Sequence, residues 1–206
     1  MKKFIFLFII FFSFNVFSQQ KIEDFYLSNF KEGSKKDWEI NGKNAVVEDK
    51  YVNINKMEAK YYSNNTVMEV KSDKAKFNKE NFNAKLEDNV EVKFPVDKGY
   101  TTITCEGPLE IEYQKGLAVF NKNVVVENPD GKLFCNIAEV YFDAENKKLI
   151  KIIAKENVKI VQNENAAFSN QAIYFADTRK IVLEGNPKIV YFPKEKNEDI
   201  RGKKSF

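Results

Sequence analysis

The chain has 206 residues, of which 43% are hydrophobic and 31% charged, with 33 Lys and Arg against 30 Asp and Glu. This composition is typical of a globular domain, and the near balance of charge excludes the strongly basic surface by which proteins bind nucleic acids. The sequence contains no His, so it lacks both the commonest general base and the usual zinc ligand sets.

The first 18 residues have the pattern of a targeting segment. Lys2 and Lys3 precede an unbroken apolar stretch from Phe4 to Phe12, and small or tolerated residues follow up to Ser18. We interpret residues 1–18 as a signal peptide that exports the chain. An uncleaved membrane anchor is the alternative, although the apolar stretch is shorter than the roughly 20 residues that a membrane-spanning helix needs. Residues 19–29 are expected to form an extended lead-in segment.

From Trp38 onward, apolar and polar residues alternate with a period of two. Val90, Val92 and Phe94 alternate with Glu91 and Lys93, for example. This period predicts half-buried β-strands. Short polar breaks suited to antiparallel turns separate the predicted strands, at residues 63–65, 97–99, 128–131, 145–147 and 177–179. The sequence therefore predicts an all-β chain.

A short motif with a central Asn occurs four times. The copies are Leu86-Glu-Asp-Asn89-Val90-Glu-Val92, Phe120-Asn-Lys-Asn123-Val124-Val-Val126, Ala154-Lys-Glu-Asn157-Val158-Lys-Ile160 and Leu183-Glu-Gly-Asn186-Pro187-Lys-Ile189. Their Asn residues are 34, 34 and 29 positions apart, which predicts stacked structural units that share one interior. Asn tolerates a left-handed backbone, so each motif is expected to mark a bend or bulge, with the apolar pair after it facing inward.

The only two cysteines are Cys105 and Cys135. In an exported protein they can form one disulfide bond, or each can be a small buried residue on its strand. The sequence leaves both alternatives open.

The repeated motif resembles the OstA-like β-jellyrolls of lipopolysaccharide transport, the LptA and LptC family, in which Leu-x-Gly-Asn-Val or Leu-x-Gly-Asn-Pro recurs. The copy at Leu183–Pro187 matches most closely, and the segment around Gly33 and Trp38 is similar to the start of an LptC domain, so an LptC-like chain is favoured. The resemblance covers roughly residues 25–206. It implies an elongated, V-shaped (taco-like) antiparallel β-jellyroll of stacked repeats over residues 30–206, preceded by the signal or anchor helix.

The resemblance also implies a function. The expected protein is a non-enzymatic periplasmic carrier or adaptor, soluble after signal cleavage or tethered to the inner membrane, which holds the acyl chains of lipid A in an apolar trough. Its expected partners are lipopolysaccharide or a related lipid, other Lpt jellyrolls that dock edge to edge, and an inner-membrane ABC transporter complex. No cofactor, metal or nucleic acid is expected. The alternatives are a periplasmic lipid or lipoprotein chaperone and a carbohydrate-binding β-solenoid.

Strand parity within the repeat selects ten residues for the lipid-binding interior. They are Phe77, Phe94, Ile111, Tyr113, Phe120, Val126, Val140, Ile160, Tyr174 and Ile189. The acidic residues of the predicted strands, such as Glu110 and Glu112, alternate with them and are expected to face solvent, so no catalytic pair is assigned.

Overall fold

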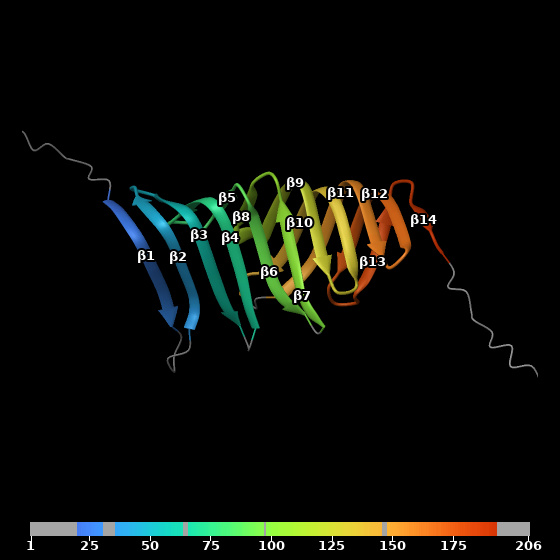
Figure 1. Cartoon of the computed structure of the whole chain (residues 1–206), viewed down its shortest axis with the longest axis horizontal. Helices are drawn as coiled ribbons and strands as arrows, with labels where there is room; N and C mark the ends of the chain where they lie inside the picture. Colours follow the sequence, from blue (N-terminus) through green and yellow to red (C-terminus); the bar gives the residue numbers. More distant parts are fainter. Residues whose placement is uncertain (1–19, 31–35, 64–65, 97, 146–147, 193–206) are drawn as a thin grey trace, which may run out of the picture.

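The computed structural model describes residues 20–30, 36–63, 66–96, 98–145 and 148–192. These residues form one antiparallel sheet of 14 strands, and their only helical element is the 3₁₀ turn η1, Tyr113–Lys115. Figure 1 shows that the strands follow one another along the long axis of an elongated molecule, from β1 at one end to β14 at the other. The prediction of an elongated all-β chain is confirmed. The predicted signal or anchor helix at residues 1–18 lies outside the described residues.

The strands run in sequence order with few exceptions. Their bounds are β1 Gln20–Phe30, β2 Lys36–Val47, β3 Tyr51–Ser63, β4 Thr66–Asn78, β5 Ala84–Glu87, β6 Val90–Val96, β7 Gly99–Cys105, β8 Leu109–Glu112, β9 Leu117–Asn128, β10 Gly131–Asp143, β11 Lys148–Gln162, β12 Asn165–Phe175, β13 Lys180–Glu184 and β14 Lys188–Val190. The first strand covers most of the segment that was expected to be a lead-in, and it pairs with β2 along nearly its whole length.

Three long strands each pair with two short ones, which reveals a crease across the sheet. One part of β4 pairs with β5 and another part with β6. In the same way β9 pairs with β8 and β7, and β12 pairs with β13 and β14. We call the side of the crease with β5, β8 and β13 the β5 half, and the side with β6, β7 and β14 the β6 half. Figure 1 shows β5 and β8 apart from β6 and β7 in the middle of the molecule.

The repeated Asn residues create the crease. Asn89, Asn123, Asn157 and Asn186 all have a positive φ, between 50° and 57°, and the residue before each of them is left-handed as well. Two successive left-handed residues turn the chain sharply, and the strand pairing shifts its register at these positions. The predicted bends are therefore confirmed. In β9 and β11 the bend lies inside one long strand rather than between two strands.

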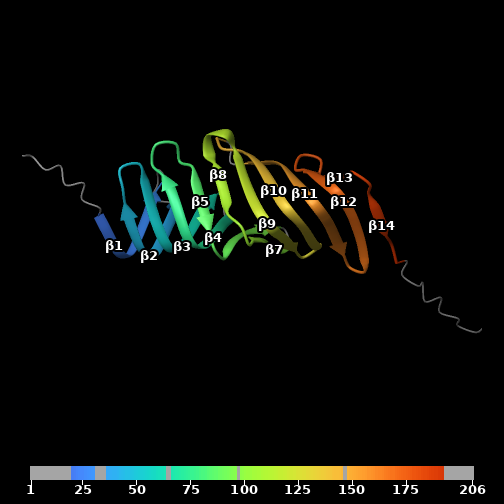
Figure 2. The ribbon, with the colours of Figure 1, turned by 90° about the horizontal axis from the view of Figure 1, so that it is seen from above.

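The core lies on the inner side of the crease. Leu109, Val124 and Ala154 are each only 1% exposed. A single open sheet cannot bury side chains so completely on one face, so the two halves must fold toward each other and cover these residues. Small side chains such as Ala138 and Ala172 fill the crease where the halves converge. Figure 2, seen from above, shows that the strands continue in the same succession along the whole length.

Candidate functional site

Apolar side chains form two continuous rows across the inner face of the β5 half. The strand register places the residues of each row side by side on neighbouring strands. The row beside the crease contains Ala45, Ile54, Ala75, Leu86, Leu109, Phe120, Ala138, Ala154, Ala172 and Leu183. The next row outward contains Val47, Val52, Phe77, Ala84, Ile111, Ala118, Val140, Ile152, Tyr174 and Ile181.

The β6 half carries a matching apolar row that runs through every strand of that half. Each neighbouring pair in this row is a register pair of the sheet. The row contains Leu27, Ile40, Ala59, Val70, Val92, Ile103, Val126, Leu133, Ile160, Ala167 and Ile189. We call these three rows together the interior face. The face is apolar from one end of the sheet to the other.

The structure places nine of the ten sequence-predicted site residues on strand positions that belong to this face or continue it toward the rims, and the tenth, Tyr113, directly after a strand. Phe120 lies in the row beside the crease and is buried, so it belongs to the core. The second row of the β5 half holds Phe77, Ile111, Val140 and Tyr174.

The remaining five lie on the β6 half and at the ends of the strands. Val126, Ile160 and Ile189 are in the row of the β6 half, and Phe94 lies one step further from the crease on β6. Tyr113 starts the turn η1 just after β8. Ile189, at the end of the sheet, is 73% exposed, so the row remains open there.

The alternate residues of the same strands point to the outer surface. Lys93 packs over the ring of Tyr100 with 4.4 Å between Nζ and the ring centroid. Lys159 lies between the rings of Phe134 and Phe168, 5.8 and 5.9 Å from their centroids. The outer surface is therefore built from long charged side chains that cover aromatic rings, as amphipathic Lys side chains do.

Both cysteines are buried and free, so the alternative of a disulfide bond between Cys105 and Cys135 is not formed in this structure. They lie on β7 and β10, and β9 with Val124 runs between these strands. Two strand spacings amount to about 10 Å, more than the roughly 7 Å between Cα atoms that a disulfide spans. Burial raises the pKa of both thiols, that of Cys135 to about 11, which keeps them protonated and unreactive.

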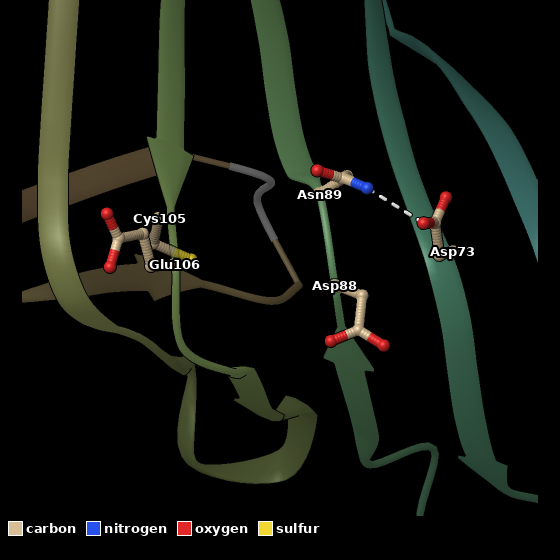
Figure 3. Close-up of a pocket in the computed structure, with 5 residues that line it drawn as sticks. All are labelled: Asp73, Asp88, Asn89, Cys105 and Glu106. Carbon is tan, nitrogen blue, oxygen red and sulfur yellow. Dashed lines mark hydrogen bonds between the residues drawn. The ribbon is translucent and has the colours of Figure 1, made fainter.

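A polar depression of about 470 Å³ lies at the crease and is lined by Asp73, Asp88, Asn89, Cys105 and Glu106 (Figure 3). It is open to solvent, and none of its lining residues belongs to the three rows of the interior face. Asn89 Nδ2 donates a hydrogen bond of 2.8 Å to Asp73, as Figure 3 shows, and Lys56 Nζ donates another of 2.8 Å to the second oxygen of the same carboxylate. Both bonds lower the pKa of Asp73, and the bond from Lys56 has the larger effect.

The other acidic groups of the depression are also paired. Lys74 Nζ lies 2.8 Å from the Asp88 carboxylate, and Glu106 accepts a hydrogen bond from Asn123 at 2.9 Å. Within the described part of the chain, no group of three or more His, Cys, Asp or Glu residues could hold a metal ion. The depression is best explained as a place where hydrogen bonds and ion pairs connect the bends of neighbouring strands.

The first strand is held to the sheet by a buried carboxylate. Glu39 on β2 accepts hydrogen bonds from Lys36 at 2.6 Å and from the Tyr26 hydroxyl on β1 at 2.8 Å, and Lys60 Nζ on β3 lies 3.6 Å from it. The bonds from Lys36 and then Tyr26 lower the pKa of Glu39 to about 2. The carboxylate thus links three strands near the N-terminal edge and remains ionised at physiological pH.

Sequence reasoning missed parts of the interior face. Leu27 and Ile40 belong to the row of the β6 half, but the segment of Leu27 was expected to be an extended lead-in before the jellyroll. Ala84 and Ala118 lie in the second row of the β5 half, where a small side chain gives little apolar signal. Phe142 follows Val140 with the same parity as the predicted residues, so the alternation pattern alone could have found it.

No helix in the described ranges has the length and hydropathy needed to cross a membrane.

Comparison with known proteins gives one family match. Residues 108–204 match the family model described as LptA/(LptD N-terminal domain) LPS transport protein. The matched part begins just before β8 and includes the last three copies of the Asn motif. No curated protein matches the chain. The model names LptA and LptD, so it does not decide between an LptA-like and an LptC-like chain. Over residues 108–204, the chain is therefore similar to this OstA-like family of lipopolysaccharide transport proteins.

Proposed function

We propose that the chain is a non-enzymatic periplasmic carrier or adaptor that holds the acyl chains of lipid A on its interior face during lipopolysaccharide transport. The observation that carries the proposal is the continuity of the apolar rows. Each row crosses the sheet strand by strand. Neither the second row of the β5 half nor the row of the β6 half is interrupted by a charged residue. The family match supports the same function.

The physical chemistry of such a surface suits transport. Burial of an acyl chain gives about 0.8 kcal/mol per methylene group and has no preferred direction. A row of Val, Ile, Leu and Phe therefore binds a chain at many equivalent positions, so the lipid can move along the sheet without a deep minimum. The direction of movement would come from an ATP-driven partner, and we propose an inner-membrane ABC transporter complex for this role.

The two ends of the sheet are the proposed docking sites for other Lpt jellyrolls. Among the described strands, β1 pairs only with β2, and β13 and β14 pair only with β12. Their outer edges therefore present unpaired backbone groups that a strand of a partner protein can extend. Exposed apolar side chains accompany both edges, with Ile22 and Leu27 at one end and Ile181 and Ile189 at the other. Edge-to-edge docking would join the interior faces of successive proteins.

Photo-crosslinking tests whether lipid contacts the interior face. A photoreactive amino acid is placed singly at Phe94, Val126 or Ile160 in the full chain, in cells that produce lipopolysaccharide. We expect crosslinked lipopolysaccharide at all three positions, because each side chain belongs to the interior face or continues it.

Lys93 and Lys159 provide the matched controls, since each is the sequence neighbour of a tested residue and packs on rings of the outer surface. Probes there should remain unlabelled. Equal labelling at inner and outer positions would refute the assignment of the faces, and absence of labelling at all five positions would refute lipid carriage. Thermal unfolding of each variant confirms that the fold is intact.

A further inference from the structure

Three aromatic side chains form an exposed cluster at the rim of the β5 half. Phe82 lies in the turn between β4 and β5, Tyr113 starts η1 after β8, and Phe142 lies near the end of β10. The ring centroids of Phe82 and Tyr113 are 6.3 Å apart, and those of Tyr113 and Phe142 are 6.4 Å apart. Phe82 is 55% and Tyr113 42% exposed. We call these three residues the rim cluster.

Backbone contacts fix the rim cluster in place. The side-chain oxygen of Asn83 accepts a hydrogen bond of 3.2 Å from the backbone N–H of Tyr113, which joins the first two turns. The N–H of Phe142 donates to the carbonyl of Gly116 at 2.8 Å, which joins the second turn to β10. Gly116 has a φ of +61°, and a Cβ atom there would lie 2.0 Å from the carbonyl oxygen of Phe142. Only glycine allows this close approach, so Gly116 keeps the second turn against β10.

The rim cluster continues the interior face outward. On β8 and η1, Leu109, Ile111 and Tyr113 are alternate residues whose exposure rises from buried through half-buried to exposed. On β5, Leu86 and Ala84 are buried, and Phe82, with the same parity in the preceding turn, is exposed. A lipid whose chains lie on the interior rows would therefore place the boundary between its acyl chains and its polar part at the rim cluster.

The opposite rim in the middle of the molecule is mixed in character. The turn between β9 and β10 holds the polar residues Asn128 and Asp130, whereas Val96 and Tyr100 flank the turn between β6 and β7 and are 39% and 55% exposed. The ring of Tyr100 lies under Lys93. The rings of the rim cluster contact one another instead, and an exposed aromatic group of this size is stabilised when a ligand covers it.

We propose that the rim cluster binds the saccharide part of the acylated glycolipid whose chains occupy the interior face. The proposal rests on the function proposed above. A pyranose ring has one face of C–H groups that packs against aromatic rings, and hydroxyl groups that remain in water at a half-exposed site. The cluster offers such rings at the point where the interior face meets solvent. It would thus distinguish a glycolipid from a simple fatty acid.

Binding measurements with two ligands test this proposal. The dissociation constants of the full chain for purified lipopolysaccharide and for a fluorescent C16 fatty acid are compared between the wild type and the variants Phe82→Asn and Tyr113→Ala. Phe82 has a φ of 60°, a conformation that Asn adopts readily, so the first variant should keep its fold. We expect each variant to weaken lipopolysaccharide binding about 3- to 10-fold while fatty-acid binding changes less than about 2-fold.

Phe168→Ala is the matched control, because Phe168 has a similarly exposed ring on the outer surface. It should leave both dissociation constants unchanged. Equal weakening of both ligands by the rim variants would make the cluster an acyl contact and overturn the proposal, as would no weakening of either. A wild-type chain that binds neither ligand would overturn the proposed function itself, so the two failures are distinguishable.

Discussion

Ser72 and Ser169 lie beside the crease on the inner side of the β6 half, where they are register partners of Met57 and Val158. Both are buried. The hydroxyl of Ser169 donates a hydrogen bond of 2.9 Å to the carbonyl of Gln171, whereas Ser72 Oγ has no hydrogen-bond partner among the described residues. A buried hydroxyl without a partner loses its hydration and gains nothing in return.

The two serines should therefore respond in opposite ways to replacement by Ala. We expect Ser72→Ala to raise the free energy of unfolding by about 0.5–1 kcal/mol, since it removes a polar atom that is buried without compensation. Ser169→Ala should lower that free energy by about 1 kcal/mol, because it removes a hydrogen bond. Urea unfolding of the full chain measures both. A similar loss of stability in the two variants would show that Ser72 has a partner.

At the scale of single residues, alternation along the strands was enough to assign most side chains to the inner or outer surface. Val92 and Ile160 face inward as predicted, since a period of two leaves only two choices for each strand. The pattern could not find residues whose position depends on the crease. Ala154 is buried because the two halves converge there, and Ser72 is buried for the same reason. Burial that results from the approach of two halves of the sheet cannot be recognised from the residues next to a position in the sequence.

At the scale of elements, the bends are the decisive feature. The residue before each repeated Asn is left-handed, but only the last copy of the motif has Gly there, namely Gly185. Asp88, Lys122 and Glu156 occupy the corresponding positions with φ between 60° and 63°. Each of these side chains costs about 1 kcal/mol or more in a left-handed conformation that glycine adopts freely.

Lys122→Gly should therefore raise the free energy of unfolding by about 0.5–1 kcal/mol, even though glycine usually weakens a strand. The ion pair that is lost, with 3.5 Å between Lys122 Nζ and Glu106, is exposed and contributes little. Lys71→Gly is the control, because Lys71 has a comparable exposed ion pair of 3.6 Å with Glu58 but lies in β4 without a positive φ. It should lower stability by about the same amount. Destabilisation by both variants in denaturant titrations would contradict this account of the bends.

The Asn motif predicted the bends from Asn89 onward because Asn is one of the few residues that favour a left-handed backbone. The bends near the N-terminus carry no such signal. Asp24 in β1 and Lys56 in β3 also have positive φ values, of 46° and 53°. Their neighbours in the sheet impose the same turn on them, so tertiary packing overrides the local preference. For that reason the pairing of β1 could not be predicted from the sequence.

At the scale of the whole molecule, the repeat of about 34 residues predicted an elongated stack, since a unit with one apolar face must share its interior with its neighbours. The structure confirms this arrangement. The sequence could not decide between a disulfide bond and two buried thiols, because that choice depends on β9 lying between Cys105 and Cys135. The assembly of the rim cluster was also not predictable, since it brings two turns together with the end of β10, which are distant in sequence.

The central claim is that the interior face carries the acyl chains of lipopolysaccharide, and the lipid that remains bound to the protein tests it most directly. The full chain, residues 1–206, is produced in a lipopolysaccharide-containing host and purified without detergent. Its complex is weighed by native mass spectrometry before and after organic extraction. We predict a population heavier by the mass of one lipopolysaccharide molecule, with lipid A recovered in the extract. A chain that carries no lipid, or only phospholipid or a lipoprotein acyl group, would contradict the claim.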